Sequence, residues 1–329
     1  MRIETSAPTR IDLAGGTIDI WPLYLFHPGA QTINAAISIR ARAVVEPRAD
    51  GRIVIVSRDT GVTVEAPDFE SLRHEPRLRL LSLLAAHFEV DGLTLTTSSE
   101  SPAGAGLAGS SALNVAVCAA LSEWKRQHHQ PEALLQIAMN VEAQTIGVPT
   151  GLQDYRPALY GGLAALELEA DGIHRIPLAV DLGELSRRIT LCYTGEPHNS
   201  GTNNWAITKA HIDGDPQVFA CFERIRDTAA RMREALLASD WGRIGAAIDE
   251  EWTNRRLLAP GVTTPLIDDL IARARAAGAA AAKVCGAGGG GCVFCYGPPD
   301  RKEEIKAALT AGGARLLDFT FEHKGLVRG

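Results

Sequence analysis

Two glycine-rich segments are the features of this sequence that most clearly could do chemistry. Residues 102–113 read PAGAGLAGSSAL, and residues 283–296 read KVCGAGGGGCVFCY. Glycine allows the backbone to approach a ligand closely, and neighbouring N–H groups can then face an anion together. Both segments therefore predict a place where the main chain comes very close to a ligand or to another part of the protein.

The first segment has the outward form of a dinucleotide fingerprint, since Gly104, Gly106 and Gly109 match G-x-G-x-x-G between an expected strand and helix. A Rossmann unit needs an apolar strand directly after that helix, but here the polar residues 122–129 and a second helix follow. No G-x-x-x-x-G-K-[S/T] sequence occurs, which excludes a P-loop. We therefore expect a phosphate-binding loop that leads into a helix capped by Ser110 or Ser111, with an ordinary glycine turn as the alternative.

The second segment has five glycines in six residues between two expected strands. Ordering so many glycines is costly in conformational entropy, which favours close backbone approach over a simple turn. Cys292 and Cys295 form C-x-x-C without a second cysteine pair, and strand alternation places them on opposite faces. We interpret them as packing residues and not as a zinc or redox site.

Short strands and helices should position these segments. Apolar runs bounded by turn residues predict strands at Ile53–Val56, Val62–Glu65 and Leu93–Thr97. Helical periodicity begins near Ser110 and again after Pro131. A hairpin of Leu163–Glu169 and Ile173–Leu178, turned by Asp171-Gly172, should follow.

Beyond residue 185 the expected order is a strand at 189–193, a glycine-and-asparagine loop and helices over about 216–257. A helix opened by Thr264-Pro265, strands at 281–285 and 292–296, a helix at 300–309 and a strand at 315–321 complete it. Apart from the extra helices this is βαββαβ, the ferredoxin-like or split βαβ arrangement. The fold class is therefore α+β, with domains at 1–185 and 186–329.

Composition agrees with two domains, because 329 residues at ~150 per domain can bury two cores. Apolar residues make up 46% and charged residues 22%, and no apolar run reaches the ~18 residues of a membrane span. The net charge of −6 argues against nucleic acid or an anionic membrane as a partner. Six scattered cysteines and an N-terminus without an apolar stretch lead us to expect a cytoplasmic protein.

Three segments together resemble the three motifs of the GHMP kinases, a superfamily named for galactokinase, homoserine kinase, mevalonate kinase and phosphomevalonate kinase. They are APTRIDLAGGTIDIWPLY (Ala7–Tyr24), PAGAGLAGSSAL and KVCGAGGGG, in the family's order and at its spacings. The first motif, together with GLQDYRPALYGGL (Gly151–Leu163), is most similar to sugar kinases of the D-glycero-D-manno-heptose 7-phosphate kinase and fucokinase type.

The resemblance implies a two-lobed GHMP kinase fold in which ATP and an acceptor meet between the lobes. It implies an ATP-dependent, Mg²⁺-requiring phosphotransferase that acts on a sugar hydroxyl. The expected acceptor group is the anomeric hydroxyl of D-glycero-D-manno-heptose 7-phosphate or of a related sugar. The expected partner is this small-molecule acceptor, and the protein should be a monomer or a homodimer.

The family's roles fall on particular residues of this sequence. Asp154 matches the catalytic base and Arg10 the basic residue that keeps it ionised, with a loop-capping aspartate and a surface arginine as the plain alternatives. Glu142 and Ser110 match the Mg²⁺ ligands, although Ser111 could replace Ser110 and a solvated glutamate is the alternative. The remaining implied contacts are Gly16, Thr17 and Asp19 for the acceptor, and Gly104, Ala105, Gly106, Leu107, Ala108, Gly109, Ser110, Ser111, Gly288 and Gly289 for the nucleotide.

Two departures bear on the acceptor. Thr17 and Ile18 replace a glycine and a threonine before Asp19, and residues 194–205 (TGEPHNSGTNNW) lack the Arg-Ser-Ser type run of heptose kinases. An arginine there would suit a phosphate on the sugar. His198, Lys209 or His211 could supply the charge instead. The alternatives are a kinase for a free sugar such as galactose, fucose or a uronic acid, and a catalytically silent nucleotide-binding regulator.

The silent regulator is the weaker alternative, because it has no chemical need for Arg10, Ser110, Glu142 and Asp154 together. The other histidines (His27, His128, His129 and His323) have no recognisable partners and are expected at the surface. Trp205, Trp241 and Trp252 are expected to pack helices.

Overall fold

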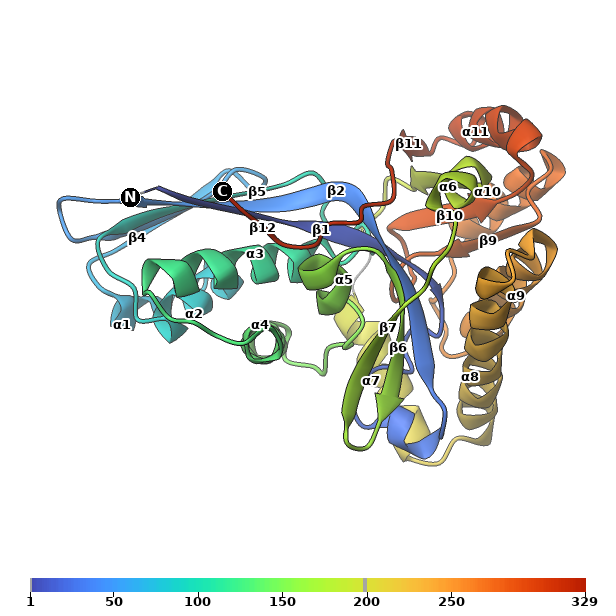
Figure 1. Cartoon of the computed structure of the whole chain (residues 1–329), viewed down its shortest axis with the longest axis horizontal. Helices are drawn as coiled ribbons and strands as arrows, with labels where there is room; N and C mark the ends of the chain where they lie inside the picture. Colours follow the sequence, from blue (N-terminus) through green and yellow to red (C-terminus); the bar gives the residue numbers. More distant parts are fainter. Residues whose placement is uncertain (1, 198–199) are drawn as a thin grey trace.

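The fold is built around two β-sheets (Figure 1). The computed structural model describes residues 2–197 and 200–329, without the side chains of 200–203. The larger sheet has eight strands in the order β12-β1-β2-β5-β3-β4, and β2 also pairs with β6, which pairs with β7. Its strands are β1 Ile3–Ala14, β2 Gln31–Pro47, β3 Ile53–Ser57, β4 Val62–Ala66, β5 Leu93–Ser99, β6 Leu163–Glu169, β7 Gly172–Pro177 and β12 Val327–Arg328.

The two longest strands, β1 and β2, were not predicted. They pair antiparallel along most of their length, and β2 then uses its two ends for different partners, pairing with β5 from Ala41 and with β6 up to Ala35. The last eight residues of β1 are all buried, so the strand lacks the apolar–polar alternation that marks a half-exposed strand. These strands form the long axis that joins both parts of the molecule (Figure 1).

Helices cover one face of this sheet in Figure 1. They are α1 Phe69–Leu72, α2 Arg79–His87, α3 Gly109–Trp124, α4 Pro131–Ile146 and α5 Tyr155–Tyr160. Helix α3 is buried along most of its length, where small residues such as Ala112, Ala116 and Ala119 allow close packing against β1 and β2. The close fit of α3 fixes the start of this helix, and with it the glycine loop that precedes it.

The smaller sheet is antiparallel, in the order β11-β8-β10-β9. Its strands are β8 Ile189–Tyr193, β9 Ala281–Val284, β10 Cys292–Tyr296 and β11 Arg315–Leu317, and its helices are α6 Leu182–Arg188, α7 Ser200–Ile212, α8 Pro216–Leu237, α9 Trp241–Arg255, α10 Pro265–Ala276 and α11 Lys302–Ala311, with short 3₁₀ turns η1 Leu23–Phe26 and η2 Pro299–Arg301. This order confirms the ferredoxin-like βαββαβ expectation and the α+β fold class.

The C-terminal residues return to the first sheet. Strand β12 pairs with β1, and Phe321 forms an isolated bridge with Ile37. The expected strand at 315–321 therefore ends at Leu317, because the chain leaves the smaller sheet there. The domain boundary at 185–186 stays a prediction. It falls between β7 and β8, but the last residues of the chain pair with the N-terminal sheet and not with the C-terminal one.

Several local expectations can be compared with the structure. The loop expected at 194–205 is helical from Ser200, where α7 begins. Cys292 and Cys295 are both buried and belong to different apolar clusters, as expected for opposite faces. Trp252 is buried as predicted, but Trp205 is 52% exposed, which disagrees with its predicted packing role. No helix of the described residues is long and apolar enough to cross a membrane.

Candidate active site

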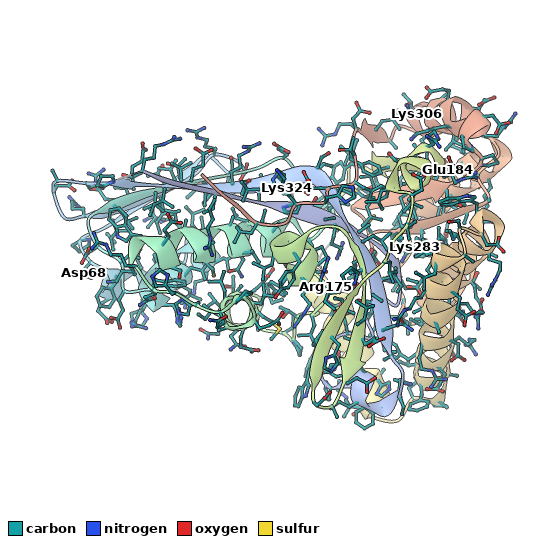
Figure 2. The ribbon with its side chains drawn as sticks, in the orientation of Figure 1. Asp68, Arg175, Glu184, Lys283, Lys306 and Lys324 are labelled. Atoms are coloured by element: carbon teal, nitrogen blue, oxygen red, sulfur yellow. The ribbon has the colours of Figure 1, made fainter. Side chains whose placement is uncertain are left out.

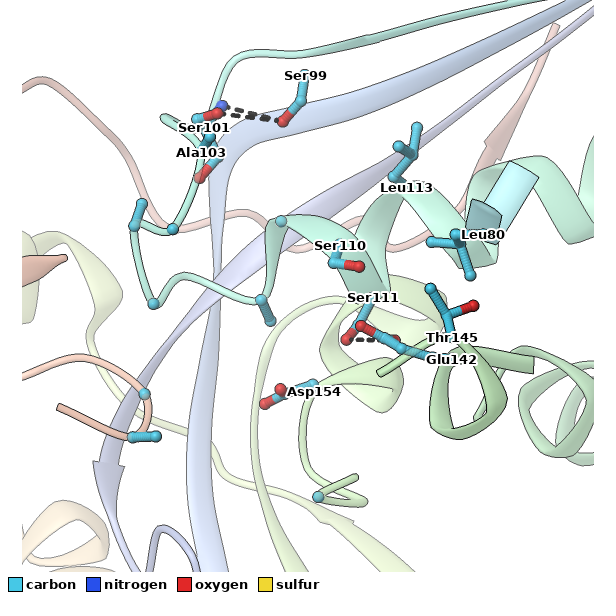
Figure 3. A pocket seen from close by; sticks show the side chains of 18 of the residues that line it. Leu80, Ser99, Ser101, Ala103, Ser110, Ser111, Leu113, Glu142, Thr145 and Asp154 are labelled. Carbon is cyan, nitrogen blue, oxygen red and sulfur yellow. Dashed lines mark hydrogen bonds between the residues drawn. The ribbon is translucent and has the colours of Figure 1, made fainter. Parts of the chain in front are cut away.

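One cavity of about 600 Å³ brings together most of the predicted site residues. It lies where the start of α3, the loop after β1, the segment before α5 and the second glycine loop meet, and Figure 3 shows Ser110, Ser111, Glu142 and Asp154 around it. The predicted residues that line it are Arg10, Thr17, Asp19, Gly104, Ala105, Gly106, Ala108, Gly109, Ser110, Ser111, Glu142 and Asp154. Gly16, Leu107, Gly288 and Gly289 lie outside that lining.

The first glycine loop presents the open N-terminus of α3 to this cavity. Gly104, Gly106 and Ala108 have positive φ angles, and Ala108, the residue before the helix, makes no side-chain cap. The predicted serine cap is therefore wrong, because the helix begins at Gly109, one residue before Ser110. The first N–H groups of an uncapped helix favour an anion.

Leu107 holds the loop instead of lining the cavity. Its side chain is fully buried, and its carbonyl accepts a hydrogen bond of 3.0 Å from the backbone N–H of Arg10. The loop is thereby fixed to β1.

The backbones of the two glycine loops pack directly against each other. This close packing explains why the second loop contains so many glycines. A Cβ on Gly286 would lie 2.9 Å from the carbonyl oxygen of Gly106, and one on Gly291 would lie 2.8 Å from that of Ala105. The N–H of Cys292 also donates to the Ala105 carbonyl at 2.7 Å. Close approach was therefore predicted correctly, and its partner is the first loop.

Gly288 and Gly289 face a different neighbour. A Cβ on Gly288 would lie 2.3 Å from the carbonyl oxygen of Val262, and the N–H of Gly289 donates to the same oxygen at 2.9 Å. In this loop the cavity is lined by Gly286 and Ala287. The structure therefore does not place Gly288 and Gly289 with the other nucleotide candidates.

Arg10 connects the catalytic candidate to the first glycine loop. Its Nε and Nη2 both donate to Oδ1 of Asp154, at 3.0 and 2.6 Å, and its Nη1 donates to the carbonyl oxygen of Gly106 at 2.7 Å. Burial by itself would lower the pKa of Arg10, but the carboxylates of Asp154 and Asp12 outweigh it and raise the pKa. Arg10 is thus a buried, permanent cation that lines the cavity, and not the surface arginine of the alternative interpretation.

Glu142 lies in a cluster of hydroxyl groups at the start of α3. Its Oε2 accepts hydrogen bonds from Ser111 Oγ at 3.1 Å (Figure 3) and from Tyr155 Oη at 2.6 Å. Burial raises its pKa, while hydrogen bonds from Tyr155 and Ser110 oppose the rise. The glutamate is 7% exposed, so it is not the solvated residue of the alternative interpretation.

This cluster fits Mg²⁺, which prefers oxygen ligands and commonly takes one or two carboxylates together with substrate phosphates. Glu142 offers a buried carboxylate whose pKa is raised by burial and by the charge of Asp154. Ser110 lines the cavity beside it. The described residues contain no group of three or more His, Cys, Asp or Glu placed to hold a metal. A Mg²⁺ bound here would take the nucleotide's phosphates and water as its other ligands.

The acceptor candidates lie on the loop between β1 and η1. Asp19 is fully buried, its Oδ2 accepts the backbone N–H of Gln153 at 2.9 Å, and burial and the charge of Asp154 raise its pKa to about 6. Thr17 has φ +74° and its Oγ1 accepts from Arg255 at 3.1 Å. Gly16 packs directly against the Arg255 guanidinium, so its role is to make room for that group.

A buried ionic network beneath the cavity was not predicted. Asp12 contacts Lys283 at 3.0 Å and Arg255 at 2.7 Å, and its Oδ1 accepts the backbone N–H of Gly286 at 3.2 Å. Glu251 accepts the N–H groups of Gly15 and Gly16. Lys283 lies where the long strands meet the C-terminal elements (Figure 2).

This network joins the loop after β1 and the second glycine loop to α9. Burial by itself would raise the pKa of Asp12, but Lys283, Arg255 and Arg10 hold it well below its usual range. Asp12 and Lys283 lie inside the first and third motif segments, and Glu251 and Arg255 are one helical turn apart in α9, which were the only sequence signals for these residues.

The histidines that were expected at the surface differ in how deeply they are buried. His27 is fully buried, and its two ring nitrogens contact Glu223 at 2.5 Å and His211 at 2.8 Å, so its expected surface position is wrong. The turn η1, directly before His27, is too short to produce an apolar periodicity from which the burial of His27 could be predicted. His128 and His323 are exposed as predicted, and His129 is partly buried beside Ser122.

Comparison with known proteins finds matches along most of the chain. Residues 77–162 match the family described as GHMP kinases N terminal domain, and residues 232–315 match GHMP kinases C terminal. A D-glycero-alpha-D-manno-heptose 7-phosphate kinase of Campylobacter jejuni is 28% identical over 98% of each chain. A mevalonate kinase of Thermococcus sibiricus is also 28% identical, over 96% of each chain.

Solved structures give the same fold. A D-glycero-D-manno-heptose 1-phosphate kinase from Bacteroides thetaiotaomicron superposes with a TM-score of 0.80 at 25% identity, over 99% of this chain and 98% of the other. A galactokinase of Lactococcus lactis, crystallised with galactose, also has a TM-score of 0.80 but is 18% identical, so it supports the fold alone.

Proposed function

The chain belongs to the GHMP kinase superfamily, and on that premise we propose that it transfers the γ-phosphoryl group of ATP to a hydroxyl group of a sugar. The acceptor in this proposal is D-glycero-D-manno-heptose 7-phosphate or a related sugar, phosphorylated at its anomeric hydroxyl. The heptose assignment is supported by similarity to the Campylobacter jejuni heptose kinase along nearly the whole of both chains.

One relationship carries the proposal. Asp154, bonded to the permanent cation Arg10, lies in the same cavity as the uncapped start of α3 and Glu142. A phosphoryl transfer needs donors for the phosphates, a cation for the developing charge and a group to receive the acceptor's proton. These residues offer each of the three within one cavity.

The chain's own residues act as follows in this proposal. The backbone N–H groups of residues 106–111 hold the nucleotide's phosphates, since no Walker lysine exists and the loop is uncharged. Asp154 receives the proton of the attacking hydroxyl, most directly at Oδ2, because Oδ1 accepts both bonds from Arg10. Arg10 holds that carboxylate in place and couples its position to the glycine loop through the Gly106 carbonyl.

Mg²⁺, held by Glu142 and Ser110, would neutralise charge on the nucleotide's phosphates. Ser111 and Tyr155 orient the Glu142 carboxylate through their bonds to its Oε2. We therefore assign Ser110 as the ligand and Ser111 as the residue that positions Glu142. A Ser111→Ala variant should raise the Mg²⁺ concentration needed for half-maximal rate less than Ser110→Ala does.

A free sugar is the second candidate acceptor, favoured by the partners that four candidate cations already have. Arg10 and Arg255 are already paired with carboxylates, Lys209 pairs with Asp213, and His211 bonds to His27. None of these four is therefore an unpaired cation for a sugar phosphate, and His198, the remaining candidate, lies outside the described residues.

The test is an acceptor screen with ADP release as readout. The panel contains D-glycero-D-manno-heptose 7-phosphate, the free heptose, mannose, galactose, fucose, glucuronic acid and mevalonate. The proposal expects kcat/KM for the heptose 7-phosphate to exceed that for free heptose at least ~10-fold, because each bond to a charged group contributes ~1.5 to 3 kcal/mol. Equal rates would favour the free-sugar kinase, and mevalonate as the best substrate would reject a sugar acceptor.

A further inference from the structure

Two buried oxygen atoms in the acceptor region have no hydrogen-bond donor among the residues that the structure describes. They are Oδ1 of Asp19 and Oε1 of Gln153, both on residues that line the cavity. Asp19 is fully buried and Gln153 is 5% exposed. A buried acceptor without a donor is costly, and such atoms in a native site call for a ligand or water that supplies the donor.

The structure holds these residues next to each other. The backbone N–H of Gln153 donates to the other Asp19 oxygen, Oδ2, at 2.9 Å, and Ile20 forms an antiparallel bridge with Gly151. A Cβ on Gly151 would lie 2.5 Å from Asp19 Oδ2, so any larger residue at this position would displace the Asp19 carboxylate.

The pair is also close to the proposed base. Gln153 immediately precedes Asp154, whose Oδ1 is held by two bonds from Arg10. The segment 151–154 therefore carries a hydroxyl acceptor and the proposed base on adjacent residues, and the position of one is fixed relative to the other.

We infer that Gln153 is a specificity-determining residue whose Oε1 accepts a hydrogen bond from a second hydroxyl of the acceptor, while Asp19 Oδ1 accepts one from another. The inference rests on the proposed function and narrows its substrate class. The acceptor must carry at least two hydroxyl groups besides the one that is phosphorylated. A carboxylate oxygen and an amide oxygen only accept, which matches hydroxyl donors and excludes groups that lack a proton to donate.

A site built on buried acceptors should reject an analogue that lacks one of the hydroxyls, because the acceptor is then left unpaired. The experiment is a cycle between enzyme and substrate variants. The substrates are D-glycero-D-manno-heptose 7-phosphate and its 2-deoxy, 3-deoxy and 4-deoxy analogues. The enzymes are the wild type, Gln153→Leu and Asp19→Asn, and kcat/KM is measured for every combination, together with KM for ATP.

We expect wild-type kcat/KM to fall ~10- to 100-fold for two of the three analogues. In Gln153→Leu the discrimination against one of these two should shrink to within ~3-fold, while discrimination against the other stays. KM for ATP should stay within ~2-fold, since Gln153 is on the acceptor side. Gln136→Leu, the same change at an exposed position of α4, is the matched control and should keep the wild-type pattern.

Two outcomes would overturn the inference. In the first, Gln153→Leu loses the same factor on the parent sugar and on all three analogues, which a purely structural role produces. In the second, Gln153→Leu keeps the wild-type kcat/KM throughout. A wild-type enzyme that phosphorylates none of these heptoses would instead overturn the proposed acceptor, and with it this inference, so the two failures are distinguished by the wild type alone.

Discussion

The guanidinium of Arg10 donates two hydrogen bonds to a single oxygen of Asp154, and its third nitrogen donates to the carbonyl of Gly106. Residues 144 positions apart are thus held in one unit with the phosphate-binding loop. The Asp154 side chain remains 26% exposed, while that of Arg10 is 3% exposed. The carboxylate therefore faces the cavity, and the cation supports it from behind.

This unit predicts the effect of Asp154→Asn. The amide keeps the size of the side chain but cannot take a proton, so kcat should fall by about two to four orders of magnitude, the usual share of a general base. The affinity for ATP should be nearly unchanged, because the residue faces the acceptor. Single-turnover rates together with nucleotide binding would measure both quantities.

A variant of Arg10 tests whether the two residues act together. Arg10→Met should also lower kcat, and the double variant should lose less than the sum of the two losses, since the residues act together. A turnover of Asp154→Asn within ~3-fold of the parent, with chemistry rate-limiting, would show that Asp154 is not the base.

For Glu142→Gln we expect a higher Mg²⁺ requirement. The change removes a carboxylate charge and keeps the shape, so turnover should fall and the Mg²⁺ concentration for half-maximal rate should rise ~10-fold or more. Nucleotide binding without metal should change less. An unchanged Mg²⁺ titration would remove Glu142 from the metal site.

Gly286→Ala tests the contact between the glycine loops. A methyl group there would lie 2.9 Å from the Gly106 carbonyl oxygen, which should displace the phosphate-binding loop and raise KM for ATP ~10-fold or more. Gly261→Ala is the matched control, because Gly261 has a similar φ of +87° but no atom within 4 Å. It should show only the strain of a positive φ, about 1 kcal/mol of stability. Equal effects of the two changes on KM would contradict the contact.

The pKa of Asp19 predicts a pH dependence. Because burial and Asp154 raise this pKa from 3.8 to about 6, the folded protein binds more protons than the unfolded chain between these values. The free energy of unfolding should therefore be greatest, for this group, below about pH 4, and should decrease as pH rises to about 6. The acceptor KM should rise below pH 6, where the protonated carboxyl has lost an acceptor.

Asp19→Asn should abolish both effects in that window. Urea unfolding and acceptor KM, each measured from pH 4.5 to 7.5, would compare the variant with the parent. A parent KM that stays constant across the range would show that ionised Asp19 does not bind the acceptor.

Lys283→Met tests the buried network. The change leaves Asp12 and Glu251 with one cation fewer in a fully buried position, and removing one partner of such a network should cost about 3 to 5 kcal/mol of stability. Lys306→Met, at an exposed ion pair with Glu303, should cost under about 1 kcal/mol. Chemical denaturation of the two variants would measure the difference, and similar small losses would show that the network does not stabilise the fold.

Local signals were enough to locate many elements and part of the site. Turn residues and alternation predicted the β6–β7 hairpin, β8 and β10 within a residue or two, because those signals act over neighbouring residues. The order of strands and helices predicted the ferredoxin-like sheet. The motif resemblance then located Arg10, Asp154 and Glu142, which the structure brings into one cavity.

Other features have no local signal. The strands β1 and β2 lack alternation because they are buried on both faces along much of their length, and that burial depends on helices and strands from elsewhere in the chain. The burial of His27 likewise depends on Glu223 and His211, almost two hundred residues away.

The sequence by itself determined which residue types and turns were available: glycines able to take positive φ, an uncharged loop before a helix, and a carboxylate and an arginine in recognisable motifs. Only the tertiary structure decided their partners. It packed Gly286 against the backbone of Gly106, paired Lys283 with Asp12 and bonded the backbone of Gln153 to Asp19. The physical reason is that local patterns report which backbone conformations neighbouring residues favour, whereas these contacts join segments more than a hundred residues apart and form only when the whole core closes around them.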